Sequence, residues 1–261
     1  MTFYIVDSFT DTPFSGNPAA VCILDKDISD ELKQKIAAEI NLSETAFLIK
    51  DSECFNLRWF TPKVEVDLCG HATLASAHIL WQLGVLNESE EAIFNTKSGV
   101  LKARKSGDLI EMDFPIEKAL EVECPLELIR GIEYKPIYVG KNRFDYLAVY
   151  ESEEIIRKIN PDLQYIKKLN SRGLIVSAKS SFTKYDFVSR FFGPNAGIDE
   201  DPVTGSAHCC LSPFWSKRLG KKELIGFQAS KRGGVVYTKL EDNKVVLLGS
   251  AVTVIKSEML I

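Results

Sequence analysis

A chain of 261 residues that is 45% hydrophobic and 26% charged can bury the core of one large domain or of two medium-sized domains. Its formal net charge of −4, without Lys and Arg clustered among aromatic residues, argues against a nucleic-acid partner. The N-terminus shows no signal-peptide pattern and no stretch reaches the roughly 18 apolar residues of a membrane span, so we expect a cytoplasmic protein without membrane contact.

Strand and helix signals alternate through the first half of the chain. The predicted elements are strands at 3–6, 19–24, 45–49 and 55–60, a helix capped by Ser29, and a hairpin at 100–104 and 109–114. A further helix begins at Gly70 and is apolar over much of its circumference, through Leu74, Leu80 and Trp81. This pattern is typical of a helix enclosed by a curved sheet rather than of one lying on a surface.

The second half repeats this order of elements. Its predicted strands lie at 136–139, 146–150, 174–176, 186–192, 235–240 and 245–255. Asn160 and Pro161 predict the N-cap and first residue of a helix over 162–169. A second glycine-started helix begins at Gly205. Pro213 within it predicts a kink or a fresh start, because the proline ring would oppose the carbonyl of Cys209.

Three pairs of motifs indicate that the two halves arose by internal duplication. R-W-F-T-P at 58–62 is echoed by R-F-F-G-P at 190–194, L-C-G-H-A at 68–72 by V-T-G-S-A at 203–207, and Leu83-Gly84 by Leu219-Gly220. Each echo follows about half a chain length later. We therefore predict an N-terminal domain at 1–116 and a C-terminal domain at 124–249, joined by a charged linker. The last strand, near 250–261, is a candidate to pack back on the first domain.

The two glycine-started helices each offer a site for an anion. Backbone N–H groups in the first turn of a helix have no intrahelical partner, and the positive end of the helix dipole lies behind them. A carboxylate or an enolate-like oxyanion suits such a site. Gly70, Thr204 and Gly205 are therefore candidate substrate-binding residues, with both helix starts facing one cleft between the domains. An ordinary capped helix behind the acidic residues 199–201 is the alternative.

Cofactor and metal motifs are weak or absent in the sequence. No phosphate loop, G-x-S-x-G turn or dinucleotide fingerprint occurs, so we expect no cofactor. Soft and borderline metal ligands lie near both helix starts, namely Cys69, His71, His78, His208, Cys209 and Cys210. No C-x-x-C pair exists, and the adjacent Cys209 and Cys210 point to different sides of a helix, so we expect no metal site. All six cysteines are expected to be reduced, because so long a chain needs no disulfide framework.

Five motifs resemble those of the PhzF-like phenazine-biosynthesis isomerase family. They are G-N-P-A-A-V at 16–21, S-E-T-A-F at 43–47, R-W-F-T-P at 58–62, L-C-G-H-A-T at 68–73 and D-E-D-P-V-T-G-S-A-H at 199–208. The match runs in the right order from residue 3 to about residue 210. The resemblance implies an α+β fold of the diaminopimelate-epimerase type. In that fold, two pseudo-symmetric domains each wrap a curved β-sheet or barrel around a central helix, and the site lies between them.

The resemblance also implies the roles of individual residues. The glutamate of S-E-T-A-F is the catalytic acid/base of that family and falls on Glu44, which spacing alone does not distinguish from the other acidic residues. The family's other catalytic positions fall on His71, Asp201 and Ser206. Related epimerases and racemases use two thiols, one at each helix start, and Cys69 occupies the first such position. The second helix start has no cysteine, which favours a one-carboxylate isomerase over a two-thiol racemase.

Taken together, the sequence predicts a cofactor-independent isomerase that moves a proton on a small carboxylate-bearing substrate. Glu44 would take a proton from carbon and return it elsewhere, while N–H groups at Gly70 and Gly205 stabilise the developing charge. His71, Asp201 and Ser206 would orient the substrate and shuttle protons.

Two other functions stay open. One is an epimerase or racemase of a small amino or hydroxy acid, with Glu44 in place of a thiol. The other is a catalytically idle dimer that binds metabolites or a protein partner. In each case we expect a homodimer.

Overall fold

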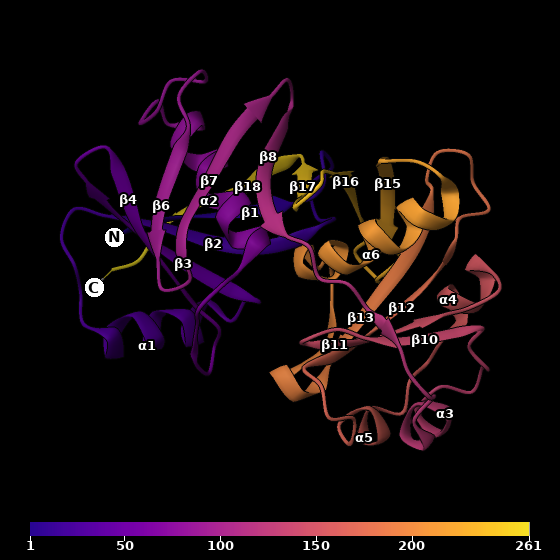
Figure 1. The fold of residues 1–261 in the computed structure, drawn as a ribbon. Helices are drawn as coiled ribbons and strands as arrows, with labels where there is room; N and C mark the ends of the chain where they lie inside the picture. Colours follow the sequence, from indigo (N-terminus) through magenta and orange to yellow (C-terminus); the bar gives the residue numbers. More distant parts are fainter. Residues whose placement is uncertain (261) are drawn as a thin grey trace. The chain divides into compact units, whose positions relative to one another are not determined.

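The computed structural model describes residues 1–260 and divides the chain into two compact units, which are treated separately below (Figure 1). Unit 1 contains Met1–Asp113 and the C-terminal segment from Leu248, and unit 2 contains Phe114–Leu247. The chain passes between the units within β8 (Leu109–Pro115) and again within β17 (Lys244–Gly249). No helix among the described residues is long and apolar enough to cross a membrane.

Unit 1 is a mixed sheet built around one central helix. Its strands are β1 (Thr2–Ser8), β2 (Asn17–Leu24), β3 (Glu44–Asp51), β4 (Cys54–Phe60), β5 (Glu65–Val66), β6 (Ala92–Thr96), β7 (Gly99–Ser106) and β18 (Ala251–Glu258), and its helices are α1 (Asp30–Ile40) and α2 (Gly70–Gln82). β1 pairs antiparallel with both β2 and β18, β2 pairs parallel with β3, and β4 pairs antiparallel with β3 and parallel with β6. The last strand therefore packs on the first strand of unit 1.

Helix α2 is enclosed by this sheet, as its apolar circumference predicts. It packs against β1, β2, β3, β7 and β18 (Figure 1), and almost every residue from His71 to Trp81 is buried. The outer helix α1 is capped as expected, because Oγ of Ser29 accepts a hydrogen bond from the Leu32 backbone N–H. The packing of α2 in the sheet positions the side chains at the start of this helix.

Unit 2 repeats the plan of unit 1. Its strands are β9 (Leu120–Glu121), β10 (Tyr138–Lys141), β11 (Asp145–Val149), β12 (Gly173–Lys179), β13 (Phe187–Gly193), β14 (Ile198–Asp201), β15 (Glu223–Gln228) and β16 (Gly234–Leu240), and its helices are α3 (Leu126–Gly131), α4 (Glu153–Lys158), α5 (Leu163–Ile166), the 3₁₀ turn η1 (Pro194–Ala196) and α6 (Gly205–Leu219). The hairpin β10–β11, the parallel pair β11–β12 and the parallel pair β13–β15 match β1–β2, β2–β3 and β4–β6. Helix α6 corresponds to α2 and packs on β15 and β16.

An equivalent ion pair lies at the same place in both units. Nε and Nη2 of Arg58 on β4 donate to the carboxylate of Glu65 on β5. Nε and Nη2 of Arg190 on β13 donate in the same two-point way to Glu200 on β14. The repeated arginine of the duplicated motifs thus ties the short strand before each central helix to its neighbour.

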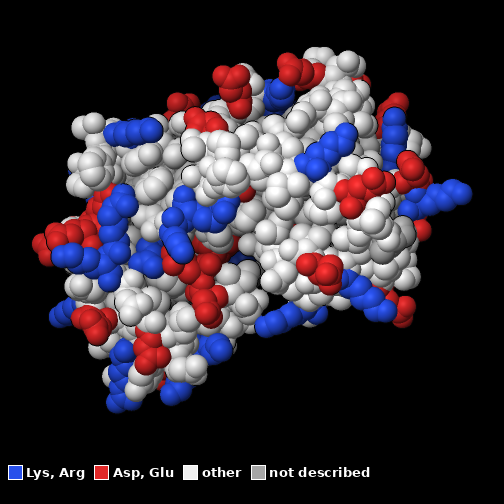
Figure 2. Space-filling view, turned by 180° about the vertical axis from the view of Figure 1, so that it is seen from behind, with Lys and Arg blue, Asp and Glu red and all other residues white. Residues whose placement is uncertain are grey.

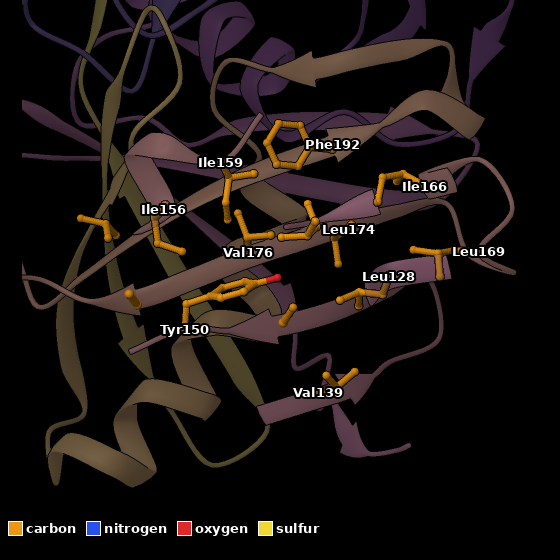
Figure 3. Packing of buried hydrophobic residues seen from close by; sticks show 14 residues of the cluster. Leu128, Val139, Tyr150, Ile156, Ile159, Ile166, Leu169, Leu174, Val176 and Phe192 are labelled. Atoms are coloured by element: carbon orange, nitrogen blue, oxygen red, sulfur yellow. The ribbon is translucent and has the colours of Figure 1, made fainter. Parts of the chain in front are cut away.

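Both faces of the unit 2 sheet are buried. On one face, Leu174 and Val176 pack with Tyr150, Ile156 and Phe192 in the cluster shown in Figure 3. On the other face, Ile175 of the same strand packs in a second cluster with residues of α6. This explains why β12 reads as a continuous apolar run rather than as an alternating one.

One helix prediction in unit 2 is wrong, and of the two alternatives predicted at Pro213 the fresh start does not occur. The helix expected over 162–169 is the single turn α5, and its cap is Asp162, whose carboxylate accepts from the Gln164 N–H. Pro213 neither ends nor restarts α6, which runs through it. The Cys209 carbonyl that Pro213 leaves without a helical donor accepts instead from the Glu117 backbone N–H at 3.2 Å. The charged segment before Pro125 is thereby attached to unit 2, where β9 also pairs with β10.

Charged side chains of both signs are interspersed on the molecular face in Figure 2. Many of the arginines and lysines are in ion pairs, such as Arg104 with Glu111 and Lys158 with Glu154. This distribution differs from the broad basic surface that is typical of nucleic-acid-binding proteins.

Candidate active site

The pair Glu44 and His71 forms the centre of the candidate site in unit 1. Glu44 is the first residue of β3 and lies beside Ala19 of β2, whereas His71 is the second residue of α2. Nε2 of His71 lies 3.1 Å from Oε2 of Glu44, in the geometry of an ion pair rather than of an aligned hydrogen bond. Their side chains are 7% and 10% exposed, so the pair is nearly buried yet still reachable from solvent.

Three neighbours hold the His71 ring and backbone. Oγ of Ser8 on β1 donates to the His71 carbonyl at 2.8 Å. Nδ2 of Asn17 lies 3.2 Å from Nδ1 of His71, and Sγ of Cys69 lies 3.5 Å from the same nitrogen. Because an amide NH₂ only donates, this orientation of Asn17 makes Nδ1 an acceptor and places the ring proton on Nε2, facing Glu44. Protonated His71 would require the Asn17 amide to turn its oxygen toward Nδ1.

The pKa of His71 is raised well above its ordinary value of 6.5. Burial disfavours the imidazolium and lowers the pKa, but the neighbouring Cys69 and Glu44 groups raise the pKa by more. Burial and the Glu44 charge raise the pKa of the Cys69 thiol to about 11, so the thiol is neutral near pH 7. We therefore attribute the raised pKa of His71 chiefly to Glu44.

A histidine titration tests this assignment. The chain has three histidines, and burial lowers the pKa of His78 and takes that of His208 to about 4. In a ¹H–¹⁵N spectrum of the side chains, only His71 should stay protonated above pH 7, and Glu44→Gln should lower its pKa. A pKa of His71 at or below 6.5 in the wild type would contradict the pairing.

The same shift has a consequence for stability. The pKa of His71 is higher in the folded protein than in the unfolded chain, so protonation of this histidine stabilises the folded state. This contribution to the free energy of unfolding is complete at a pH below the pKa in the unfolded chain. It is lost as the pH rises through the pKa in the folded protein.

A second polar group lies in unit 2, around the start of α6. Oγ1 of Thr204 donates to Oδ2 of Asp201 at 2.5 Å, and the Thr204 N–H donates to Oε1 of Gln228 at 2.9 Å. Nε2 of Gln228 donates in turn to the Asp201 carbonyl. Since its hydroxyl is engaged by Asp201, Thr204 does not cap α6 with its side chain, and Cys69 does not cap α2 either. Both helix starts thus lack a side-chain cap, as an anion site requires.

Ser206 has a partner that the sequence reasoning missed. Nη2 of Arg172 donates to Oγ of Ser206 at 3.0 Å, and Nε of Arg172 donates to Oδ1 of Asp145 at 3.0 Å. Asp145 is 1% exposed, and burial raises its pKa against the opposing effect of Arg172. Because Arg172 donates to the serine oxygen, the Ser206 hydroxyl can direct its own proton to another acceptor. No sequence motif distinguished Arg172, Asp145 or Gln228.

The structure groups the predicted site residues by unit. Glu44, Gly70 and His71 belong to unit 1, and the others to unit 2, namely Asp201, Thr204, Gly205 and Ser206. Their catalytic and binding roles stay predictions.

One group of possible metal ligands was not foreseen. Glu44, Cys69 and His71 each place a ligand atom within 4.8 Å of the other two. The spacing of Cys and His along the sequence does not reveal this group, because Glu44 comes from β3. His208 does not belong to this group. It is fully buried in unit 2, where its Nδ1–H donates a hydrogen bond to the Thr204 carbonyl.

Comparisons with known proteins all point to one protein family. A family model described as phenazine biosynthesis-like protein matches residues 6–257. An uncharacterized isomerase of Halalkalibacterium halodurans is 52% identical over 259 residues, which cover 99% of this chain and 98% of that protein. The crystal structure of a PhzF-family phenazine biosynthesis protein from Enterococcus faecalis has a TM-score of 0.96 at 40% identity, covering 100% of this chain and 99% of that one.

A more distant likeness concerns the fold alone. A hydroxyproline epimerase from Agrobacterium vitis, solved with bound trans-4-hydroxy-L-proline, has a TM-score of 0.66 at 11% identity, covering 98% of this chain and 91% of that one. The predicted α+β fold of the epimerase type is therefore confirmed.

Proposed function

The chain belongs to the phenazine biosynthesis-like protein family, and on that premise we propose that it is a cofactor-independent isomerase acting on a small carboxylate-bearing metabolite. The proposed reaction is acid/base transfer of a carbon-bound proton from one position to another. The name of the similar protein from Halalkalibacterium halodurans, an uncharacterized isomerase, supports this reaction class.

One observation carries the proposal, namely the nearly buried pair of Glu44 and His71. A carboxylate beside an imidazole, which itself belongs to the first turn of a helix without a side-chain cap, supplies a base, a proton donor and a site for negative charge. The Ser8 and Asn17 contacts restrain His71, so these groups are held in place before a substrate arrives. Preorganised groups of this kind stabilise a transition state without having to reorganise during the reaction.

The proton transfer proceeds in two steps. The carboxylate of Glu44 removes a proton from carbon, and the electron pair of the broken C–H bond moves into a conjugated, enolate-like system. N–H groups at the start of α2, from Gly70 onward, stabilise the negative charge on the substrate oxygen. Protonated Glu44 then returns the proton to a second carbon, and the carboxylate is restored. His71 holds the Glu44 carboxyl group in position between turnovers.

The groups around Asp201, Thr204, Gly205 and Ser206 are proposed to act on the same substrate. The likeness to the family, rather than any measured distance, joins them to this reaction. Ser206, held by Arg172, would donate its hydroxyl proton to a substrate carboxylate, and Gly205 would contribute backbone N–H groups. Asp201 would orient the substrate through its hydrogen-bonded carboxylate.

A panel of small unsaturated and hydroxylated carboxylates, incubated with the protein and followed by ¹H NMR, tests the proposal. Movement of a double bond or of a C–H proton in any of them supports the isomerase. Ligand-dependent thermal stabilisation without turnover across the panel would favour the idle binding module instead. The homodimer expected from the sequence is part of the proposal and can be tested by sedimentation.

The epimerase or racemase alternative has one observation in its favour. Sγ of Cys69 lies at the position of a catalytic thiol, 3.5 Å from Nδ1 of His71. Against it, the pKa of this thiol is about 11, and the start of α6 carries Thr204 where a second thiol would be needed.

Cys69→Ala separates the two mechanisms. If Glu44 is the acid and base, the variant should keep kcat within about tenfold of the wild type, because the thiol carries no transferred proton and Ser8 and Asn17 still hold His71. Steady-state kinetics on the identified substrate provide the measurement. A loss as large as that of a Glu44 variant would revive the thiol mechanism.

A further inference from the structure

We propose that Arg172 and Ser206 form a subsite of unit 2 that binds the carboxylate of the substrate, an inference that rests on the proposed function. Arg172 lies just before β12, and Ser206 is the second residue of α6. Nη2 of Arg172 donates to Oγ of Ser206 at 3.0 Å. Arg172 thus contacts the substrate directly as well as holding Ser206.

The strand registers of the two units place Arg172 beside the counterpart of Glu44. The arginines of the repeated motifs pair across the sheet with Phe47 in β3 and with Val176 in β12. Glu44 precedes Phe47 by three residues, and Gly173 precedes Val176 by three, so Glu44 and Gly173 occupy equivalent positions. Arg172 is the residue directly before Gly173.

The helix starts of the two units correspond in the same way. His71 is the second residue of α2 and Ser206 the second residue of α6, so Ser206 takes the place of His71. Unit 1 therefore presents a carboxylate beside an imidazole at this place, whereas unit 2 presents a guanidinium beside a hydroxyl. A guanidinium and a hydroxyl donor suit a negatively charged part of the substrate.

The guanidinium of Arg172 is held in place by its surroundings. Nε donates to Oδ1 of Asp145 at 3.0 Å, and Nη2 pairs with Oδ2 of the same carboxylate, which is 1% exposed. The guanidinium also lies over the rings of Phe144 and Phe191, at 5.4 and 5.3 Å from their centroids. A group that is fixed in this way loses little conformational entropy when it binds a ligand.

Two hydrogen-bond donors remain available on this pair. Nη1 of Arg172 donates to no group within residues 1–260, and the Arg172 side chain is 35% exposed. Because the guanidinium is planar, one Nη1–H lies on the same edge as the Nη2–H that donates to Ser206. A carboxylate beside Ser206 can therefore accept from Nη1 and from the serine hydroxyl. Asp145 neutralises the charge of Arg172, so the directed donors and the positive end of the α6 dipole supply the attraction.

Crotonate is the probe for this subsite, and crotonamide is its neutral counterpart of nearly the same size. In ¹H–¹⁵N spectra, crotonate should shift the backbone signals of Gly205 and Ser206 to saturation, and crotonamide should not. Arg172→Lys loses the planar fork of donors and should bind crotonate at least about tenfold more weakly. Arg157→Lys is the matched control and should bind it like the wild type, because Arg157 is 44% exposed and also pairs with a buried carboxylate of unit 2.

Unmoved signals of Gly205 and Ser206, or unchanged affinity of Arg172→Lys, would overturn the proposal. Circular dichroism shows whether each variant is folded. If Arg172→Lys is not, Ser206→Ala serves instead, since it removes one donor without leaving Asp145 unpaired, and unchanged affinity of this variant would equally refute the subsite.

The binding test needs no turnover, so its failure differs from failure of the proposed function. Crotonate binding that depends on Arg172 supports the subsite even if no carboxylate of the panel is isomerised. If a substrate is found, Arg172→Lys should raise its KM at least about tenfold and change kcat less, because the contact is present in the ground state and in the transition state alike. Turnover with an unchanged KM in Arg172→Lys would leave the isomerase standing and reject the subsite.

Discussion

Glu44→Gln is expected to lower kcat by about 10²- to 10⁴-fold, which is the usual contribution of a positioned acid or base. The substitution keeps the size of the side chain and its hydrogen-bonding capacity but removes the ionisable carboxylate next to His71. Binding of the substrate should change little, because the backbone N–H groups at the start of α2 remain. Kinetics on the identified substrate, with KM and kcat determined separately, provide the measurement.

Glu31→Gln is a matched control for this experiment. It makes the same chemical change at an exposed position in the first turn of α1. Its kcat and its unfolding temperature should equal those of the wild type, whereas Glu44→Gln should stay folded but lose the stabilisation that comes from the raised pKa of His71. Activity of Glu44→Gln within tenfold of the wild type would reject Glu44 as the base.

Gly16→Ala is expected to destabilise the protein by about 2–5 kcal/mol, through backbone strain and a steric clash together. Gly16 has φ +66°, a left-handed conformation, and an added Cβ would lie 2.2 Å from the carbonyl oxygen of Ser8. Ser8 and Asn17, which hold His71, flank this turn, so the substitution should also disturb the candidate site. Chemical denaturation measures the first effect, and the His71 titration measures the second.

Gly84→Ala separates the two causes of this loss. Gly84 follows α2 with φ +67°, but nothing lies within 4 Å of the position of its missing Cβ. It should therefore cost only the strain of the left-handed conformation, about 1–2 kcal/mol. Equal losses for the two variants would show that the turn at Gly16 relaxes around the added methyl group.

Features that depend on local sequence could be predicted. Both glycine-started helices begin at the predicted residues, Gly70 and Gly205, because the apolar runs that follow them are long and distinctive. The hairpin of β7 and β8 was also predicted, from the turn residues between two alternating segments. The repeated motifs indicated two similar halves, and the strand pairings of the two units match.

Features that depend on distant partners could not be predicted. Arg172 reaches Ser206 only because β11, β12 and the start of α6 lie together, and no local pattern encodes that arrangement. The continuity of α6 through Pro213 depends on a donor from Glu117, almost a hundred residues earlier in the chain. Glu44 itself was identified by resemblance to a family, and only its position 3.1 Å from His71 gives a physical reason to choose it.

The central claim is that Glu44 removes a proton from carbon and returns it to another carbon. Turnover in deuterium oxide should place deuterium at the newly protonated carbon, at least in part, because the Glu44 carboxyl can exchange with solvent between the two steps. Substrate deuterated at the carbon that loses its proton should also react more slowly than unlabelled substrate in single turnovers that isolate the chemical step. Product without solvent deuterium, together with equal rates for labelled and unlabelled substrate in that step, would contradict carbon-proton abstraction.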